Sequence, residues 1–193
     1  NPITIAPQVN EDWLMEIRKQ TDEAMRRARG VITEAHDDLK RIFDRGGDDP
    51  FIEEYMTDDA DVVLVGMGAL ALPLRVAVRR LREKGRKVGF VRIKWFRPLP
   101  EPELQTVLSR FKAVGVIDRD YSLGAPANGG VLFNEVRSAM YEVDKRDPII
   151  GFIAGLGGRE ITVPLTIEMF DRVQKVADTG KIEETLSWVG VRK

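Results

Sequence analysis

Beyond the first nine residues, apolar and small side chains recur every three or four positions, which is the spacing of one helix face. Asn10 is a favourable N-cap, and the acidic residues after it suit a first helical turn. The pattern stops at Gly46 and Pro50. Its members are Leu14, Ile17, Thr21, Ala24, Ala28, Val31, Ala35, Leu39 and Ile42. We predict an extended arm followed by one long amphipathic helix.

A helix over this stretch would have roughly thirty-five residues and extend about 50 Å, which is longer than a small domain. Isolated helices of this kind seldom bury their apolar face without a neighbour. We therefore expect the helix to lie along another domain or another subunit.

After Pro50 the pattern changes to short apolar runs that alternate with helical stretches. The expected strands cover residues 62–65, 87–94, 112–118 and 149–154. The expected helices cover residues 69–84, a short stretch from 101, a stretch through 131–143, and residues 166–177 and 182–188. Strands that alternate with helices build parallel sheets. The predicted fold class is α/β, with a mostly parallel sheet of four to five strands and helices on both faces.

This division predicts two parts. Residues 1–57 form the arm and a long linker helix, and residues 58–193 form the α/β domain. The chain starts with Asn1-Pro2 and carries no signal-peptide pattern. We expect a cytoplasmic chain that is a piece of a longer product, or a processed one.

Composition removes several classes of function. Thirty Lys and Arg balance thirty-one Asp and Glu, so the chain has no bulk basic footprint for nucleic acid. No apolar run approaches the ~20 residues that span a membrane. With no cysteine and one histidine, the chain cannot supply disulfides, thiolate nucleophiles, cysteine-ligated clusters or multi-histidine metal sites. We predict no catalytic residue, no metal site, and no nucleic-acid or membrane partner.

Candidate chemistry gathers in four loops that follow the expected strands. In open parallel sheets, ligands meet the loops at the carboxyl ends of the strands. The loops are residues 66–69, 94–100, 118–130 and 155–160.

The first of these loops has the form G-x-G-x-x-A, from Gly66 to Ala71, directly after a strand. Such a turn can bring a pyrophosphate to a helix N-terminus. The acidic residue that would support a dinucleotide site is missing, because the second strand ends Ile93-Lys94-Trp95. Tight packing alone also favours glycine here, and we prefer that interpretation.

The last loop reads GLGGRE. Its three glycines, Gly155, Gly157 and Gly158, expose backbone N–H groups that can bind an anion, and Arg159 adds a guanidinium. The alternative is a structural loop in which Arg159 pairs with a neighbouring carboxylate. The residues favour neither over the other.

Other polar groups favour structural roles. Asp118-Arg119-Asp120 is more typical of a salt-bridged loop anchor than of a metal site, since hard cations need more oxygen ligands. His36 is expected to be solvated or interfacial, and the arginines of residues 26–29 form a charged helix face first and a phosphate contact second.

Four segments in order give the chain a family resemblance. They are DDADVVLVGMG at 58–68, LREKGRKVGFVRIKWFRPLP at 81–100, VIDRDYSLG at 116–124 and GLGGRE at 155–160. Together they resemble the carboxyl-terminal half of a 2-oxoacid:ferredoxin oxidoreductase α chain, with pyruvate:ferredoxin oxidoreductase (pyruvate synthase) as the nearest branch. The resemblance runs from residue 1 to about residue 177.

The resemblance implies a transketolase C-terminal-like domain within a complex that decarboxylates a 2-oxoacid onto coenzyme A. That complex uses thiamine diphosphate with Mg²⁺ and passes electrons through [4Fe–4S] clusters to ferredoxin. Those groups are implied on other domains or subunits, which would be the partners of this chain. None is expected to be bound by this chain alone.

Three hypotheses follow. The first is a non-catalytic structural and assembly part of such a complex, with pyruvate as the favoured substrate. Its loop edge would contact coenzyme A or neighbouring domains, and the candidate residues are Arg97, Arg119, Gly155, Gly157, Gly158 and Arg159. The second is a stand-alone nucleotide-binding α/β protein that uses the Gly66 turn. The third is the same type of complex acting on 2-oxoglutarate or oxalate.

Overall fold

The computed structural model describes residues 3, 8–46 and 48–192. Most of the expected arm, residues 1–2 and 4–7, lies outside the described residues. The chain divides into two compact units, residues 1–50 and 51–193.

The first unit is built on α1, Leu14–Phe43, which confirms the long helix. None of its residues is buried, and most of its large apolar side chains, among them Val31 and Ile42, are exposed. At its end, Asp44 adopts a left-handed conformation, and its backbone N–H donates to Lys40 O. His36 packs against Gly46 in the following loop and faces Asp48, with 3.6 Å between Nε2 and Oδ1.

The second unit is a six-stranded sheet in the order β1-β3-β2-β4-β5-β6. β1 runs antiparallel to β3, and all other neighbours are parallel. The strands are β1 Ile52–Tyr55, β2 Val62–Met67, β3 Val88–Ile93, β4 Ala113–Asp118, β5 Ile149–Ile153 and β6 Leu186–Trp188. The α/β class and the mostly parallel sheet are confirmed, with more strands than the four to five expected.

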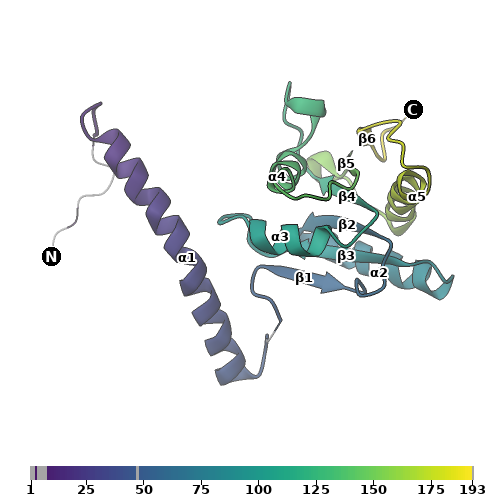
Figure 1. Ribbon diagram of the computed structural model, residues 1–193, viewed down its shortest axis with the longest axis horizontal. Helices are drawn as coiled ribbons and strands as arrows, with labels where there is room; N and C mark the ends of the chain where they lie inside the picture. The colour runs from purple at the N-terminus through teal and green to yellow at the C-terminus, as the bar shows by residue number, and fades with distance from the viewer. Residues whose placement is uncertain (1–2, 4–7, 47, 193) are drawn as a thin grey trace. The chain divides into compact units, whose positions relative to one another are not determined.

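Helices cover both faces of this sheet (Figure 1). They are α2 Ala71–Glu83, α3 Glu101–Leu108, α4 Val131–Ala139 and α5 Val163–Thr179. α2 packs on α5, and their buried side chains form one core with alternate residues of the strands, such as Leu64 and Phe152. α3 and α4 pack on each other, and α4 also contacts β4 and β5. Both faces of the central strands are therefore buried, which explains their continuous apolar runs.

The extra strands are the two edges of the sheet. β1 falls within the stretch expected to belong to the linker, and Ile52 pairs with Ile93 of β3. This pairing attaches residues 52–55 to the sheet, so the structural division falls after Pro50 rather than after residue 57.

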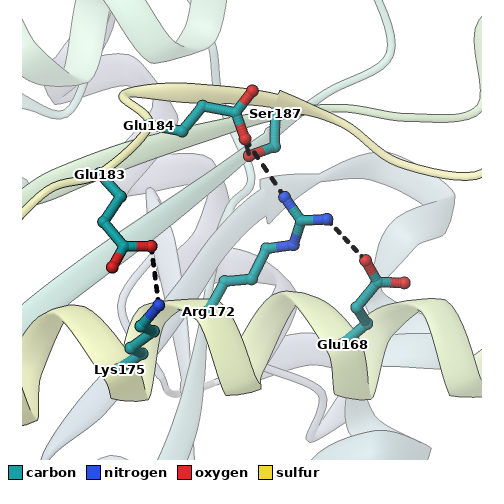
Figure 2. A network of polar contacts seen from close by, with 6 residues as sticks. All are labelled: Glu168, Arg172, Lys175, Glu183, Glu184 and Ser187. Atoms are coloured by element: carbon teal, nitrogen blue, oxygen red, sulfur yellow. Dashed lines mark hydrogen bonds and ion pairs between the residues drawn. The ribbon is translucent and has the colours of Figure 1, made fainter.

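The helix expected over residues 182–188 is wrong. Gly180 in a left-handed conformation ends α5, and residues 186–188 pair with β5 as β6. Ion pairs hold the connecting loop on α5 (Figure 2). Arg172 bridges Glu168 and Glu184, Lys175 contacts Glu183, and the Ser187 hydroxyl donates to Glu184 at 2.5 Å.

Candidate functional site

Three of the four candidate loops meet because β2, β4 and β5 are neighbours in the sheet. Together they line a cleft of about 360 Å³ at the carboxyl edge. We call this the arginine cleft. Its lining residues are Ala69 and Leu70 from the β2–α2 connection, Pro73 from the first turn of α2, Arg119 after β4, and Gly158, Arg159, Glu160 and Ile161 after β5.

The side chain of Arg119, which follows β4, extends towards the β5–α5 loop. A Cβ atom built at Gly155 would lie 3.1 Å from Arg119 Nε, so the side chain passes close over the Gly155 backbone. Within the described part of the chain, Arg119 makes no hydrogen bond or ion pair, and its side chain is exposed. Its guanidinium is therefore available to a ligand.

The glycines of the β5–α5 loop are required by its backbone. Gly155, Gly157 and Gly158 have φ angles of 74°, 63° and 81°, a region that side chains rarely adopt. Of these three, Gly158 lines the arginine cleft, and Gly155 permits the close approach of Arg119.

Arg159 reaches the arginine cleft but is partly committed elsewhere. Its Nη1 donates to the backbone carbonyl of Gly190 at 2.6 Å, which ties the loop to the carboxyl-terminal segment. The sequence left open a structural loop in which Arg159 pairs with a carboxylate. In the structure, the partner of Arg159 is a backbone carbonyl oxygen. Glu160, which sequence reasoning did not single out, lines the same cleft and opposes the charge of the arginines.

Arg97 does not line the arginine cleft. It follows β3, on the other side of β2, and its guanidinium pairs with Glu135 of α4 and lies 4.2 Å from the ring centre of Phe96. The strand order therefore separates Arg97 from Arg119 and Arg159, although the sequence gives all three similar loop positions.

Asp118 and Asp120 cap the N-terminus of α4, whereas the sequence predicted that they anchor a loop through salt bridges. The Asp118 carboxylate accepts the backbone N–H groups of Leu132 at 3.0 Å and Phe133 at 2.9 Å. Asp120 accepts the N–H of Val131 at 3.1 Å. These donors are the orphan N–H groups of a helix N-terminus, which favour a carboxylate. An aspartate at a strand end, followed by Gly129-Gly130 before a helix, is the sequence signal for this arrangement.

Asp118 is also the most perturbed carboxyl group among the described residues. Its side chain is 2% exposed. Burial raises its pKa to about 7, and the neighbouring Asp120 adds to the rise, against the two backbone N–H groups that lower it. A buried carboxyl with such a pKa is a candidate acid or base in general. In this structure both oxygens of the Asp118 carboxyl group accept N–H groups of α4, so the group caps a helix.

The Gly66 turn needs glycine at its second position, Gly68, rather than at its first. A Cβ atom built at Gly66 would lie 3.4 Å from Leu70 Cδ1, an ordinary contact, so packing alone does not require glycine there. The chain then passes through Gly68, with a φ angle of 64°, into a short 3₁₀ turn, Gly68–Leu70. The turn contributes Ala69 and Leu70 to the arginine cleft.

The described residues offer neither a metal-binding cluster nor a membrane-spanning helix. They contain no group of three or more His, Cys, Asp or Glu side chains arranged to hold a metal ion. They also contain no helix with the length and apolar character of a membrane span.

Comparison with known proteins relates this fold to one enzyme family. Residues 60–165 match the family model of pyruvate:ferredoxin oxidoreductase core domain II. The ketoisovalerate oxidoreductase subunit VorA of Pyrococcus abyssi is 33% identical over 193 residues, which are 100% of this chain and 48% of that protein. The pyruvate synthase subunit PorA of Methanocaldococcus jannaschii is 34% identical over 192 residues, with 100% and 46% covered. The chain therefore spans about half the length of these relatives.

Solved structures agree on the fold. A 2-oxoglutarate:ferredoxin oxidoreductase from Magnetococcus marinus, with 2-oxoglutarate, coenzyme A and succinyl-CoA bound, superposes with a TM-score of 0.50 at 20% identity. The match covers 89% of this chain and 24% of that one. A split-gene transketolase, described as an inactive β4 tetramer, gives a TM-score of 0.50 at 15% identity, covering 65% and 42%. At these identities the likeness shows the fold alone.

Proposed function

Because the chain belongs to the family of pyruvate:ferredoxin oxidoreductase core domain II, we propose that it is a non-catalytic structural and assembly part of a 2-oxoacid:ferredoxin oxidoreductase complex. The complex oxidatively decarboxylates a 2-oxoacid to an acyl-CoA and passes the electrons to ferredoxin. Pyruvate is the proposed substrate, and 2-oxoglutarate or oxalate is the alternative. The proposal places this complex in the cytoplasm.

One observation carries the non-catalytic role. Asp118 is the one buried ionisable side chain at the carboxyl edge of the described sheet, and both its oxygens accept backbone N–H groups of α4. A group held in this way positions a helix and is closed off from a substrate. Two of the three candidate arginines at this edge, Arg97 and Arg159, also have partners within the chain.

Exposed apolar side chains at the same edge support the assembly role. Each of the parallel strands ends at, or is followed by, a large apolar residue that is at least 37% exposed. These residues are Met67, Trp95, Leu123, Leu156 and Trp188. Apolar groups gathered on one surface mark protein interaction sites. We propose that this edge faces neighbouring domains or subunits of the complex.

The described residues do not fit the metal groups of such a complex. The chain has no cysteine to ligate an iron–sulfur cluster, and the described residues provide no carboxylate cluster for Mg²⁺. We therefore assign Mg²⁺ and the [4Fe–4S] clusters to partner domains or subunits, and with them the thiamine diphosphate that accompanies Mg²⁺ and the ferredoxin contact.

Purification of the chain from its native source tests the proposal. We expect it to copurify with polypeptides that carry thiamine diphosphate and iron–sulfur clusters, and the assembly to show 2-oxoacid-dependent reduction of ferredoxin. The 193-residue chain, supplied with thiamine diphosphate, Mg²⁺, coenzyme A and pyruvate, should show no turnover. Turnover by the chain alone would contradict the non-catalytic role.

A variant pair tests the edge. Leu123→Asp places a charge at a side chain that is 88% exposed in the loop after β4, and should weaken assembly without unfolding the chain. Ile182→Asp is the control, because Ile182 is exposed in the loop before β6, at the amino edge of the sheet. Equal assembly of both variants with the copurified partners would count against the carboxyl edge as the interface.

A further inference from the structure

We propose that the arginine cleft binds a phosphate or diphosphate group of a small-molecule ligand, with Arg119 as the residue that recognises it. This inference deepens the proposed function, on which it rests, by naming the ligand chemistry of the candidate edge.

The availability of Arg119 is the first argument. Arginine side chains in folded proteins commonly pair with carboxylates, and the other two candidate arginines have partners in this chain. Arg119 has none among the described residues, although it lines a cleft of about 360 Å³. A planar guanidinium with unused donors matches the geometry of phosphate oxygens.

The backbone around Arg119 is the second argument. Gly155 permits the Arg119 side chain to approach the loop, because a Cβ there would stand 3.1 Å from Nε and 2.9 Å from Ile161 Cδ1. No heavy atom lies within 4 Å of a Cβ built at Gly157 or Gly158, so open space adjoins the loop on that side. Successive glycines of this kind let a ligand come close to the main chain.

The charge and size of the cleft define the ligand. Arg119 and Arg159 outnumber Glu160, so the lining carries a net positive charge that favours an anion. Sites for small molecules have volumes of about 300–1,000 Å³. The volume of the arginine cleft, about 360 Å³, lies near the lower end of this range. The apolar wall of Leu70, Pro73 and Ile161 suits a ligand that continues beyond its charged group.

Inorganic pyrophosphate is the probe, titrated into the 193-residue chain at fixed ionic strength and followed by calorimetry and by backbone amide NMR. We expect saturable binding with shifts at Gly158 and Glu160. Arg119→Gln should weaken binding at least about tenfold, since a hydrogen-bonded charge is lost. Arg119→Lys keeps the charge but loses the planar guanidinium that can make two parallel hydrogen bonds, so it should also weaken pyrophosphate binding.

Two further variants separate a local site from general charge. Arg97→Gln removes the same charge from the same edge outside the cleft and should leave binding unchanged. Glu160→Gln removes the opposing carboxylate and should strengthen binding. Circular dichroism of each variant checks that the fold is retained.

The outcomes are distinct. Binding that survives Arg119→Gln, or falls equally with Arg97→Gln, overturns the site. Equal binding of citrate overturns the choice of phosphate over carboxylate. Copurification with partner chains is measured separately, so pyrophosphate binding can fail while the assembly role stands, and the reverse also holds.

Discussion

Gly130 leaves the space that the carboxyl group of Asp118 occupies, since a Cβ atom built at position 130 would come within 2.3 Å of Asp118 Cγ. The strand end and the helix start are joined at this contact. The junction between β4 and α4 therefore depends on a residue with no side chain.

Gly130→Ala should destabilise the second unit by roughly 1–3 kcal/mol, the range for overpacking a well-filled site. The methyl group would displace the carboxyl group from the N–H groups of Leu132 and Phe133. Urea denaturation followed by tryptophan fluorescence measures the change. Gly30→Ala is the control, because nothing lies within 4 Å of its built Cβ and alanine favours the α1 helix. Equal stability of Gly130→Ala and the parent would contradict the packing argument.

The raised pKa of Asp118 predicts a pH dependence of stability. Between its ordinary pKa of 3.8 and about 7, the folded chain binds a proton at Asp118 that the unfolded chain releases. The contribution of this group to the free energy of unfolding is therefore largest below pH 3.8 and is lost as the pH rises through about 7.

Asp120→Asn tests this dependence, because it removes the neighbouring carboxyl group and keeps an oxygen that can accept the Val131 N–H. The pKa of Asp118 should fall, and the loss of stability between about pH 4 and 7 should become smaller. Carboxyl carbon NMR measures the pKa, and denaturation across this range measures the free energy. Asp144→Asn, at an exposed loop carboxylate, should leave both unchanged.

Arg82 stabilises the amino edge of the sheet through hydrogen bonds to three different residues. Its guanidinium donates to the carbonyls of Val88 at 2.7 Å and Met56 at 2.6 Å, and to Asp59 at 2.6 Å, and its side chain is 13% exposed. Arg82→Ala leaves these acceptors without a partner and should cost about 2 kcal/mol. Arg80→Ala, at an exposed position of α2, should change the free energy of unfolding by less than about 0.5 kcal/mol. Comparable losses in the two variants would argue against this role of Arg82.

Arg172 should control the opening of β6. Because its bridges to Glu168 and Glu184 are partly exposed, Arg172→Ala should lower global stability by only about 0.5–1 kcal/mol. Hydrogen exchange of the β6 amides should nevertheless accelerate, because the loop before the strand loses one of its two ion pairs with α5 in the described chain and keeps the contact between Lys175 and Glu183. Gln174→Ala is the matched control, since the side-chain amide of Gln174 donates a hydrogen bond to Asp178 of the same helix and not to the loop before β6. Unchanged exchange in Arg172→Ala would show that pairing with β5 alone holds the strand.

The central strands and the helices between them were predictable, because the strands are short continuous apolar runs and the helices repeat apolar residues every three or four positions. The edge strands were not. β1 has four residues without a regular alternation of buried and exposed positions, and β6 has three residues, so neither pattern exceeds what a loop can show. Their conformation depends on pairing with β3 and β5, which lie far away in the sequence.

The residue pattern was enough to predict the α/β class, the long amphipathic helix, the family and the four loops in which polar groups gather. Which of those groups meet depends on the packing of the folded chain. Strand order brings Arg119 to Arg159 and keeps Arg97 with Glu135, and it turns Asp118 from a loop residue into the cap of a helix. Local residue patterns reflect backbone periodicity, whereas the neighbours of a strand end depend on the order in which distant strands pack.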